Sequence, residues 1–384
     1  MALPILYTLS LLLHGLVAWR LLPALDPAWA AGLAPVLLAS ALLLPMGLLA
    51  HRVARGALAD RLAWVGLLCM GLFSSLLVLT ALRDVMLAAV WVAATLGWSP
   101  AQALLPGLRA DSAVLVPLAA LLVTVLGFWN ARRTARVVRV DVPVAALPAA
   151  LEGFTVAQIT DIHVGPTIKQ HYLQAIVRKV NALEADMVAI TGDLVDGKVS
   201  ELAAHVAPLS QLRSRHGSFF VTGNHEYYSG AQAWMAELRR LGVRVLLNEH
   251  VVLDHAGPHG SAALLVAGVA DYTAHHFDPA HKSDPQAALR GAPAHARVRL
   301  LLAHQPRSAM AAADAGFDLQ LSGHTHGGQF WPWNHFVRLQ QPFTAGLHKL
   351  KDLWVYTSRG TGYWGPPKRF GAPSEITLVR LVPA

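Results

Sequence analysis

Cysteine is nearly absent from this chain of 384 residues, and charge is scarce in its first third. The single cysteine, Cys69, cannot form an intrachain disulfide, which excludes a disulfide-rich secreted scaffold. Residues 1–130 contain no Lys and no Glu, and only six Arg and four Asp, although 54% of the chain is hydrophobic. This composition excludes a disordered protein and divides the chain into two parts, one of which is expected to lie in lipid.

Four apolar stretches in the first 130 residues are each long enough to cross about 30 Å of hydrocarbon. Their interiors have almost no polar face, which argues against buried helices of a soluble domain. The predicted spans are residues 3–22, 29–50, 62–82 and 113–129. A further apolar segment, residues 85–98, is too short to span comfortably, and we interpret it as an interfacial helix or as an extension of the third span.

The positions of the arginines predict the orientation of the spans, because Lys and Arg are enriched in cytoplasmic loops. With four spans, the basic segment between the second and third spans lies on the same side as the basic segment after the fourth. The loops on the opposite side have no net basic excess. We therefore expect a multi-pass protein of the cell (inner) membrane, with both termini and the second part of the chain in the cytoplasm. The basic residues on the cytoplasmic side are Arg52, Arg55, Arg61, Arg132, Arg133, Arg136 and Arg139.

After residue 139 the sequence alternates between short β-rich runs and amphipathic helices. We expect residues 1–130 to form a transmembrane anchor, residues 131–152 a linker, and residues 153–384 an α/β domain with a largely parallel, layered sheet. Such sheets bind ligands beyond the carboxyl ends of their strands. The expected strands are residues 154–160, 187–191, 219–222, 263–269, 298–303 and 319–322, and the expected helices are residues 168–183, 201–212 and 231–241.

Polar residues follow five of the expected strands. Each one alone is weak evidence of function, because a polar residue after a strand usually belongs to a turn, but five in one domain are hard to obtain by chance. Imidazole and carboxylate donors without a thiolate favour Mn, Fe or Zn, and seven donors exceed what one ion needs, so a carboxylate that bridges two ions is indicated. The seven donors are Asp161 and His163 in DIH, Asp193 in GDLVD, Asn224 in GNHE, His304 in LLAH, and His324 and His326 in GHTH, and His225 follows Asn224 in GNHE.

These five motifs, in this order, resemble those of the calcineurin-like metallophosphoesterase superfamily over roughly residues 150–382. The membrane anchor and the closing segment, residues 358–376, are similar to the membrane-anchored YkuE/YaeI-like branch. The resemblance implies a layered α-β-β-α sandwich with two divalent metal ions and phosphoester hydrolysis.

The resemblance also implies a role for each motif residue. Asp193 would bridge the two ions. His225 would point into the site without binding a metal, and would protonate the leaving oxygen, with Asp196 or Glu226 as the group that orients it. The remaining ligands would be Asp161, His163 and His326 for the first ion, and Asn224, His304 and His324 for the second.

Other polar and aromatic residues have two interpretations each. Arg359, next to Gly360 near a strand end, is a candidate substrate-binding residue, although a surface charge explains it equally well, as it does Arg307, Lys368 and Arg369. Residues 271–284 could form a third metal site or a substrate lid, and a solvated loop is the favoured interpretation. The histidines of this loop are His275, His276 and His281. The aromatic residues, which could form an apolar rim or simply pack, are Trp331, Trp333, Phe336, Tyr363 and Trp364.

Together these features predict a membrane-bound phosphoesterase that acts on a phosphodiester or pyrophosphate bond, and the bilayer makes a lipid-linked substrate attractive. The alternative is a non-catalytic membrane adaptor with a structural metal site, which would not need His225. A transporter is disfavoured because the predicted spans contain no intramembrane carboxylates or histidine pairs that could form an ion path. The formal net charge of +8 suits nucleic acid, but no basic stripe is interleaved with aromatics, so no nucleic-acid partner is expected. No feature of the sequence defines an oligomeric state.

Overall fold

The computed structural model describes residues 2–384, with their side chains from residue 4 onward. The chain divides into two compact units. The helical unit extends to Trp129 and includes the short segment Gly365–Lys368 from the last loop of the chain. The α/β unit comprises residues 130–364 and 369–384.

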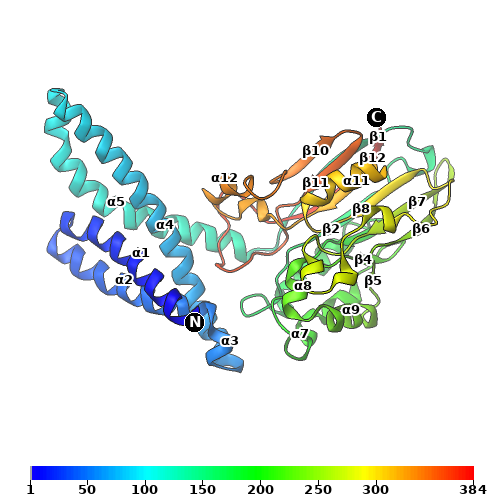
Figure 1. Ribbon diagram of the computed structural model, residues 1–384, viewed down its shortest axis with the longest axis horizontal. Coiled ribbons are helices and arrows are strands. Elements are labelled where there is room, and N and C mark those ends of the chain that lie inside the picture. Colours follow the sequence, from blue (N-terminus) through cyan, green and yellow to red (C-terminus); the bar gives the residue numbers. More distant parts are fainter. Residues whose placement is uncertain (1) are drawn as a thin grey trace. The chain divides into compact units, whose positions relative to one another are not determined.

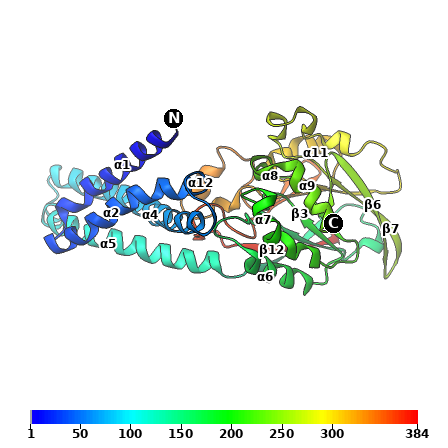
Figure 2. The ribbon, with the colours of Figure 1, turned by 90° about the horizontal axis from the view of Figure 1, so that it is seen from below.

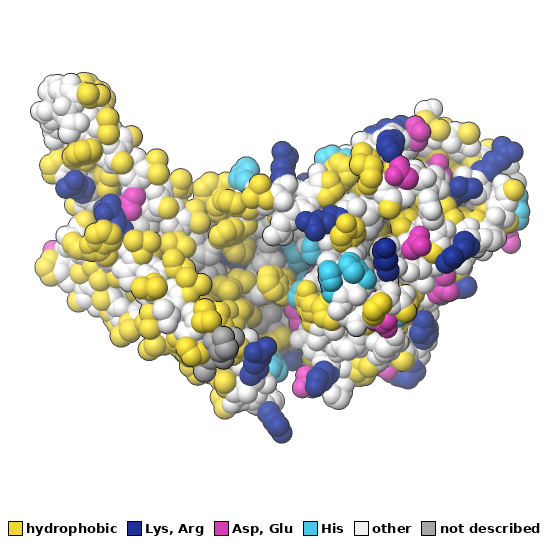
Figure 3. Space-filling model, in the orientation of Figure 1, with side chains coloured by type: hydrophobic (Ala, Val, Ile, Leu, Met, Phe, Trp, Pro, Cys, Tyr) yellow, Lys and Arg dark blue, Asp and Glu magenta, His cyan; other side chains and the backbone are white. Residues whose placement is uncertain are grey.

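Four helices of the helical unit are long and apolar enough to cross a membrane, which confirms the four predicted spans (Figure 1). Hydrophobic side chains dominate the surface of these helices, whereas charged side chains of both signs are scattered over the α/β unit (Figure 3). The segment 85–98 is mostly a continuation of the third long helix, so it extends that helix and is not separate from it. The helices are α1 (Ala2–Leu21), α2 (Pro27–Leu48), α3 (Ala50–Val53), α4 (Gly56–Thr95) and α5 (Ser99–Arg132).

Helix α2 begins where the sequence provides a cap and crosses α4 at a pair of glycines. The Asp26 side chain accepts a hydrogen bond from the backbone N–H of Ala28, and Pro27 occupies the first helical turn. A Cβ atom added to Gly47 would lie 2.5 Å from Cα of Gly66. Only glycine permits this close backbone approach, which is a common way to pack helices in lipid.

The α/β unit contains two mixed sheets of six strands each (Figure 1). The pairs β12/β2, β6/β7 and β10/β11 are antiparallel, and the other pairs are parallel. The first sheet has the order β1 (Arg136–Val144), β12 (Glu375–Pro383), β2 (Thr155–Ile159), β3 (Met187–Ile190), β4 (Ser218–Phe220), β5 (Arg244–Val245). The second has the order β10 (Gly346–Leu350), β11 (Leu353–Thr357), β9 (Leu319–Ser322), β8 (Val298–Leu302), β7 (Gly260–Gly268), β6 (Glu249–Gly257).

Both sheets are buried on two faces, which gives the predicted α-β-β-α layering. One core lies between the sheets, and each outer face packs against helices. Because side chains alternate along a strand, Met187 of β3 belongs to the inner core and Val188 to the outer one. The first sheet is covered by α6 (Gln170–Asn181), α7 (Val199–Val206) and α9 (Ala231–Arg240), and the second by α10 (Pro285–Ala288) and α11 (Ala309–Ala315) (Figure 2).

Residues 136–144, expected in the linker, instead form strand β1 at the edge of the first sheet. This strand pairs in parallel with β12 along its whole length. Its pattern suits an edge position, because Val142 and Val144 are buried while Asp141 is exposed, and because an edge strand tolerates Pro143. The pairing was not visible in the sequence because the partner strand lies at the other end of the unit.

Candidate metal centre

The candidate site lies where the carboxyl ends of β2, β3, β4, β8 and β9 meet. Backbone hydrogen bonds join the loops that follow these strands: the N–H of Asp161 donates to the carbonyl of Gly192 (3.0 Å), and that of Gly323 to the carbonyl of His304 (2.9 Å). A further bond crosses between the sheets, from the N–H of His324 to a carboxylate oxygen of Asp161 (2.9 Å). The loops of both sheets therefore form one connected base for the predicted residues.

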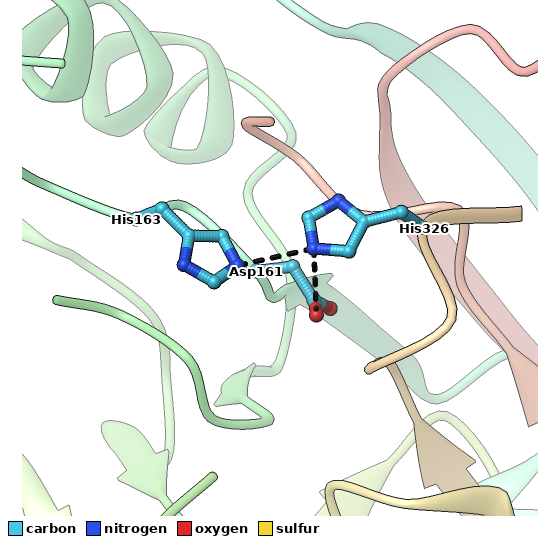
Figure 4. Close-up of side chains that lie close together, drawn as sticks. All are labelled: Asp161, His163 and His326. Carbon is cyan, nitrogen blue, oxygen red and sulfur yellow. Dashed lines mark hydrogen bonds and ion pairs between the residues drawn. The ribbon is translucent and has the colours of Figure 1, made fainter. Parts of the chain in front are cut away.

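Three overlapping groups of side chains bring possible metal-binding atoms within 4.8 Å of one another. In the first group, Nε2 of His326 lies 3.0 Å from Nε2 of His163 and 3.4 Å from Oδ1 of Asp161 (Figure 4). Asp193 belongs to both other groups, so it connects them. The groups are Asp161, His163 and His326; His163, Asp193 and His225; and Asp193, His304 and His324.

Hydrogen bonds to the far side of two imidazoles turn their other nitrogen toward the cluster. Nδ1 of His304 donates to the carbonyl oxygen of Thr191 (2.7 Å), and Nδ1 of His163 donates to Oδ1 of Asp196 (2.9 Å). The Nε2 lone pair of each ring therefore faces the donor groups, and that of His304 is 3.2 Å from Oδ2 of Asp193. This arrangement is typical of histidines that bind metal, whose second nitrogen is held by a carboxylate or carbonyl.

One buried hydrogen-bond acceptor without a donor, together with two buried carboxylates, indicates that the cluster suits a cation. Oδ1 of Asn224 is buried and has no hydrogen-bond partner among the described residues. Asn224 directly precedes His225, whose backbone N–H donates to Oδ1 of Asp193 (2.9 Å). Both Asp193 and Asp161 are buried. Oxygen and imidazole donors in this combination fit divalent metal ions such as Mn, Fe or Zn.

Several non-glycine residues at the site have positive φ angles, which the sequence did not reveal. Positive φ angles are uncommon outside glycine, and they cluster at functional sites because the surrounding structure must hold them there. Five of the predicted metal-binding residues have them: Asp161 (53°), His163 (56°), Asp193 (50°), His324 (70°) and His326 (51°).

Two glycines of the motifs are needed because carboxylates lie directly against them. A Cβ atom added to Gly323 would lie 2.1 Å from Oδ2 of Asp161, and one added to Gly223 would lie 2.2 Å from Oδ1 of Asp193. Neither distance is compatible with a side chain. The glycines of GHTH and GNHE thus allow the two carboxylates to reach the centre.

His225 lies at the edge of the cluster, with its ring held by Asp196. Its Nδ1 donates to Oδ1 of Asp196 (2.7 Å), the same oxygen that accepts from His163. Burial lowers the pKa of His225, but the hydrogen bond to Asp196 and the nearby carboxylates outweigh burial and raise it to about 9. For Asp196, burial is outweighed by the two imidazoles, which lower its pKa to about 2.

Of the two carboxylates considered as orienting groups, Asp196 contacts the His225 ring, and Glu226 has a different task. The buried Glu226 carboxylate accepts hydrogen bonds from the backbone N–H groups of Asp193 (3.0 Å), Leu194 (2.8 Å) and Gly223 (2.6 Å). It therefore fixes the two loops that carry Asp193 and His225.

The arginines near the end of the chain differ from the surface charges expected. Arg369 is fully buried, and its guanidinium donates to Nδ1 of His326 (3.0 Å) and to the carbonyl oxygens of His326 (2.8 Å) and Arg359 (2.7 Å). These contacts fix both the ring and the backbone of His326. The Arg359 guanidinium forms an ion pair with the buried Glu375 (3.0 Å), and its contact with substrate stays a prediction.

The loop of residues 271–284 is anchored and is not simply solvated as expected. His281 is buried and hydrogen-bonded to the hydroxyl of Tyr227 (2.9 Å), while the rings of His275 and His276 lie against each other. Within the described part of the chain, none of these histidines belongs to a group of three potential metal ligands.

Two exposed aromatic rings lie against His225 and a third lies against one of them, and the sequence identified only one of the three. The rings of Trp364 and Tyr228 lie 5.7 Å and 5.2 Å from the His225 ring, and Phe277 lies 5.5 Å from Tyr228. These three rings, which we call the aromatic rim, are 53%, 62% and 52% exposed respectively. Helical spacing offered one signal, since Tyr228 follows His225 by three residues in α8 (Asn224–Ser229) and so lies on the same face.

Comparisons with known proteins identify the family of the α/β unit. The family model "Calcineurin-like phosphoesterase" matches residues 154–328. A "Transmembrane protein with metallophosphoesterase domain" of Bos taurus is 43% identical over 280 residues, covering 70% of this chain and 62% of the bovine protein. An "Uncharacterized metallophosphoesterase" of Aquifex aeolicus is 31% identical over 248 residues, which cover 64% of this chain and 91% of that protein. The "Uncharacterized metallophosphoesterase YkuE" of Bacillus subtilis is 26% identical over 245 residues, covering 61% of this chain and 81% of YkuE.

The chain therefore belongs to the calcineurin-like metallophosphoesterase family, as its motifs indicated. It spans slightly less than two thirds of the length of the bovine relative. The predicted metal-binding residues and His225 all lie within the segment that the family model matches, whereas Arg359 lies outside it.

The close contact at Gly323 makes a specific prediction about metal binding. We expect Gly323→Ala to weaken Mn²⁺ binding at least about tenfold, because its methyl group must displace the Asp161 carboxylate, and each displaced charged ligand costs more than about 1.4 kcal/mol. Metal content and Mn²⁺ titration of the detergent-solubilised full chain measure this effect.

The control is Gly217→Ala, where an added Cβ meets nothing within 4 Å although φ is +85°. It introduces backbone strain without a clash at the centre, and should bind Mn²⁺ like the wild type. Equal affinity of Gly323→Ala and the wild type would contradict the expected contact.

Proposed function

We propose that the protein is a membrane-bound, binuclear metal-dependent phosphoesterase that hydrolyses a phosphodiester or pyrophosphate bond. One observation carries the proposal: buried carboxylate oxygens and imidazole nitrogens converge at the strand ends to within 4.8 Å of one another, in three overlapping groups. Membership of the metallophosphoesterase family supports the reaction class. Two-ion sites with a shared carboxylate suit in-line displacement at phosphorus.

In this proposal Asp193 is shared by two ions because it takes part in two of the donor groups. Bound divalent ions would lower the pKa of water and offset the charge of the phosphoryl oxygens. The second ion would use Asn224, whose buried oxygen is otherwise unpaired among the described residues. The full assignment is Asp161, His163, His326 and Asp193 for one ion, and Asn224, His304, His324 and Asp193 for the other.

His225 would act as the general acid. Asp196 holds its Nδ1, so Nε2 is the nitrogen that can carry a proton to the leaving oxygen. The hydrogen bond to the Asp196 carboxylate favours the protonated form of His225, because it raises the pKa of the ring. Arg359, whose side chain is 36% exposed beside its partner Glu375, would contact the phosphoryl group.

Two substitutions distinguish the proposed metal-binding role of Asp193 from the proposed general-acid role of His225. With Mn²⁺, the full chain in detergent should hydrolyse bis(p-nitrophenyl) phosphate, and Asp193→Asn should lose both bound metal and activity. His225→Ala should keep its metal and lose about 10²-fold to 10⁴-fold in kcat, the usual contribution of a general acid. Release of p-nitrophenolate and metal content measure the two effects.

His171→Ala is the matched control, because His171 is an exposed histidine of α6 and should not affect turnover. Full activity in Asp193→Asn would contradict the proposed site. A folded, metal-loaded wild type that cleaves no diester or pyrophosphate would favour the non-catalytic membrane adaptor.

We further propose that the substrate carries an apolar group next to the phosphoryl group, as a lipid-linked substrate does. The aromatic rim supports this, because the largely exposed rings of Tyr228 and Trp364 lie beside the proposed general acid and that of Phe277 lies beside Tyr228. Exposed rings grouped at a site are typical of contacts with apolar ligands.

Removing one ring should affect apolar substrates selectively. Phe277→Ala should raise KM for octyl p-nitrophenyl phosphate about threefold to tenfold, because roughly 1 kcal/mol of apolar contact is lost. KM for methyl p-nitrophenyl phosphate, which has the same leaving group, should not change. Phe336→Ala, an equally exposed ring of α12 (Trp333–Val337), serves as the control. Identical changes for both substrates would contradict an apolar subsite.

We propose that residues 1–130 anchor the chain in the cell (inner) membrane, and that residues 153–384, completed by β1, form a cytoplasmic catalytic domain. The excess of arginines near the ends of the spans on one side supports this orientation. A reporter that functions only outside the cytoplasm should be inactive when fused after Ala384, while a green fluorescent protein in the same position should fluoresce. The opposite pair of results would reverse the orientation.

A further inference from the structure

A pocket of about 670 Å³ in the helical unit collects arginines at one end of the predicted spans. It is formed by residues of α1, α4 and α5 and of the turn after α1. Charged side chains interrupt the otherwise hydrophobic surface of this unit (Figure 3). The residues of the lining that matter here are Arg20, Arg83, Arg109, Asp84, Trp19 and Trp91.

The one carboxylate of this group is fully engaged. Asp84 accepts two hydrogen bonds from Arg20, from Nε (2.8 Å) and from Nη2 (3.1 Å). The Arg20 guanidinium also lies 5.4 Å from the centre of the Trp19 ring. This ion pair fixes one arginine and neutralises it, which leaves the other two without a carboxylate of their own.

Arg83 is a buried cation held mainly by neutral groups. Its side chain is only 3% exposed and donates to the hydroxyl of Ser112 (2.9 Å) and to the carbonyl oxygens of Arg20 (3.2 Å) and Arg109 (3.0 Å). Its contact with Asp84, at 3.4 Å, is longer than either bond from Arg20. These partners satisfy the N–H groups of Arg83 without cancelling its charge.

Arg109 is exposed, and within residues 2–384 its guanidinium has neither a hydrogen bond nor an ion pair. The lining thus contains three guanidinium groups and one carboxylate. Of these three arginines only Arg83 is buried, and a buried cation held mainly by neutral groups usually marks a functional site, so the three are a candidate site. The orientation rule does not explain them, since they lie on the side away from the basic loops.

We propose that this pocket binds the phosphate group of an anionic molecule. Arg109 supplies the free guanidinium, which can bind two phosphate oxygens at once, and the buried Arg83 keeps the potential of the pocket positive. The volume lies within the usual range for small-molecule sites, about 300–1,000 Å³. Trp19 and Trp91 are residues typical of the level of lipid headgroups. Either a phospholipid headgroup or a free phosphate offers this chemistry.

The first arm of the test titrates phosphatidylglycerol into the detergent-purified full chain and measures bound lipid by native mass spectrometry. Arg109→Ala should bind about tenfold more weakly than the wild type, the loss expected for one charge-assisted contact. Arg61→Ala, which replaces an exposed arginine of α4 outside the pocket, should bind like the wild type. Arg109→Lys should retain part of the affinity, and unchanged melting temperatures would show that the variants are folded.

The second arm titrates inorganic phosphate by calorimetry in the Asp193→Asn background, which removes binding at the proposed metal centre. Phosphate binding that depends on Arg109, without a preference for phosphatidylglycerol over phosphatidylcholine, would support the pocket and identify its ligand as a soluble phosphate. If neither ligand depends on Arg109, or if phosphatidylcholine binds as tightly as phosphatidylglycerol and phosphate does not bind, the proposal is overturned.

Discussion

The α/β unit is organised around two buried carboxylates, Asp161 and Asp193, held together at the edge where the two sheets meet. Like charges in a region closed to water repel each other and need compensation. Burial raises the pKa of Asp161, whereas the pKa of Asp193 is held well below its ordinary value because His304 and other imidazoles outweigh burial. The fold therefore holds together two buried carboxylates that need positive groups around them, and the imidazoles supply part of this compensation.

The layers of strands and helices on both sides of the site hold these carboxylates in place. Strands buried on two faces fix where each loop begins, and hydrogen bonds from loop to loop then hold the left-handed backbone at Asp161, His163 and Asp193. Strained backbone persists only where such surroundings over-determine it. Arg369 and Glu226 act in the same way from behind, because each uses a buried charge to fix backbone groups of the motif loops.

The sequence predicted local features well and distant pairings poorly. Each motif has a strand end and a polar residue close together in the sequence, often with a glycine. The candidate metal-binding residues could therefore be assigned to one site before any contact was known. Arg369 resembled a surface charge because nothing in its own segment signals burial, and Phe277 joins the aromatic rim from a loop far along the chain. The antiparallel pairs of the sheets and the edge strand β1 were missed for the same reason, since strand pairing depends on partners that the local pattern does not name.

Strand β1 leaves the last long helix and pairs with β12, the last strand of the α/β unit. The other strands of the unit all lie between these two in the chain. The pairing of β1 with β12 therefore cannot form until synthesis has passed residue 375. Contacts of such long sequence separation are slow to form. The apolar helices can thus be in place while the rest of the chain is still incomplete, and β1, which pairs only with β12 among the described strands, stays without a partner until the last strand has been made.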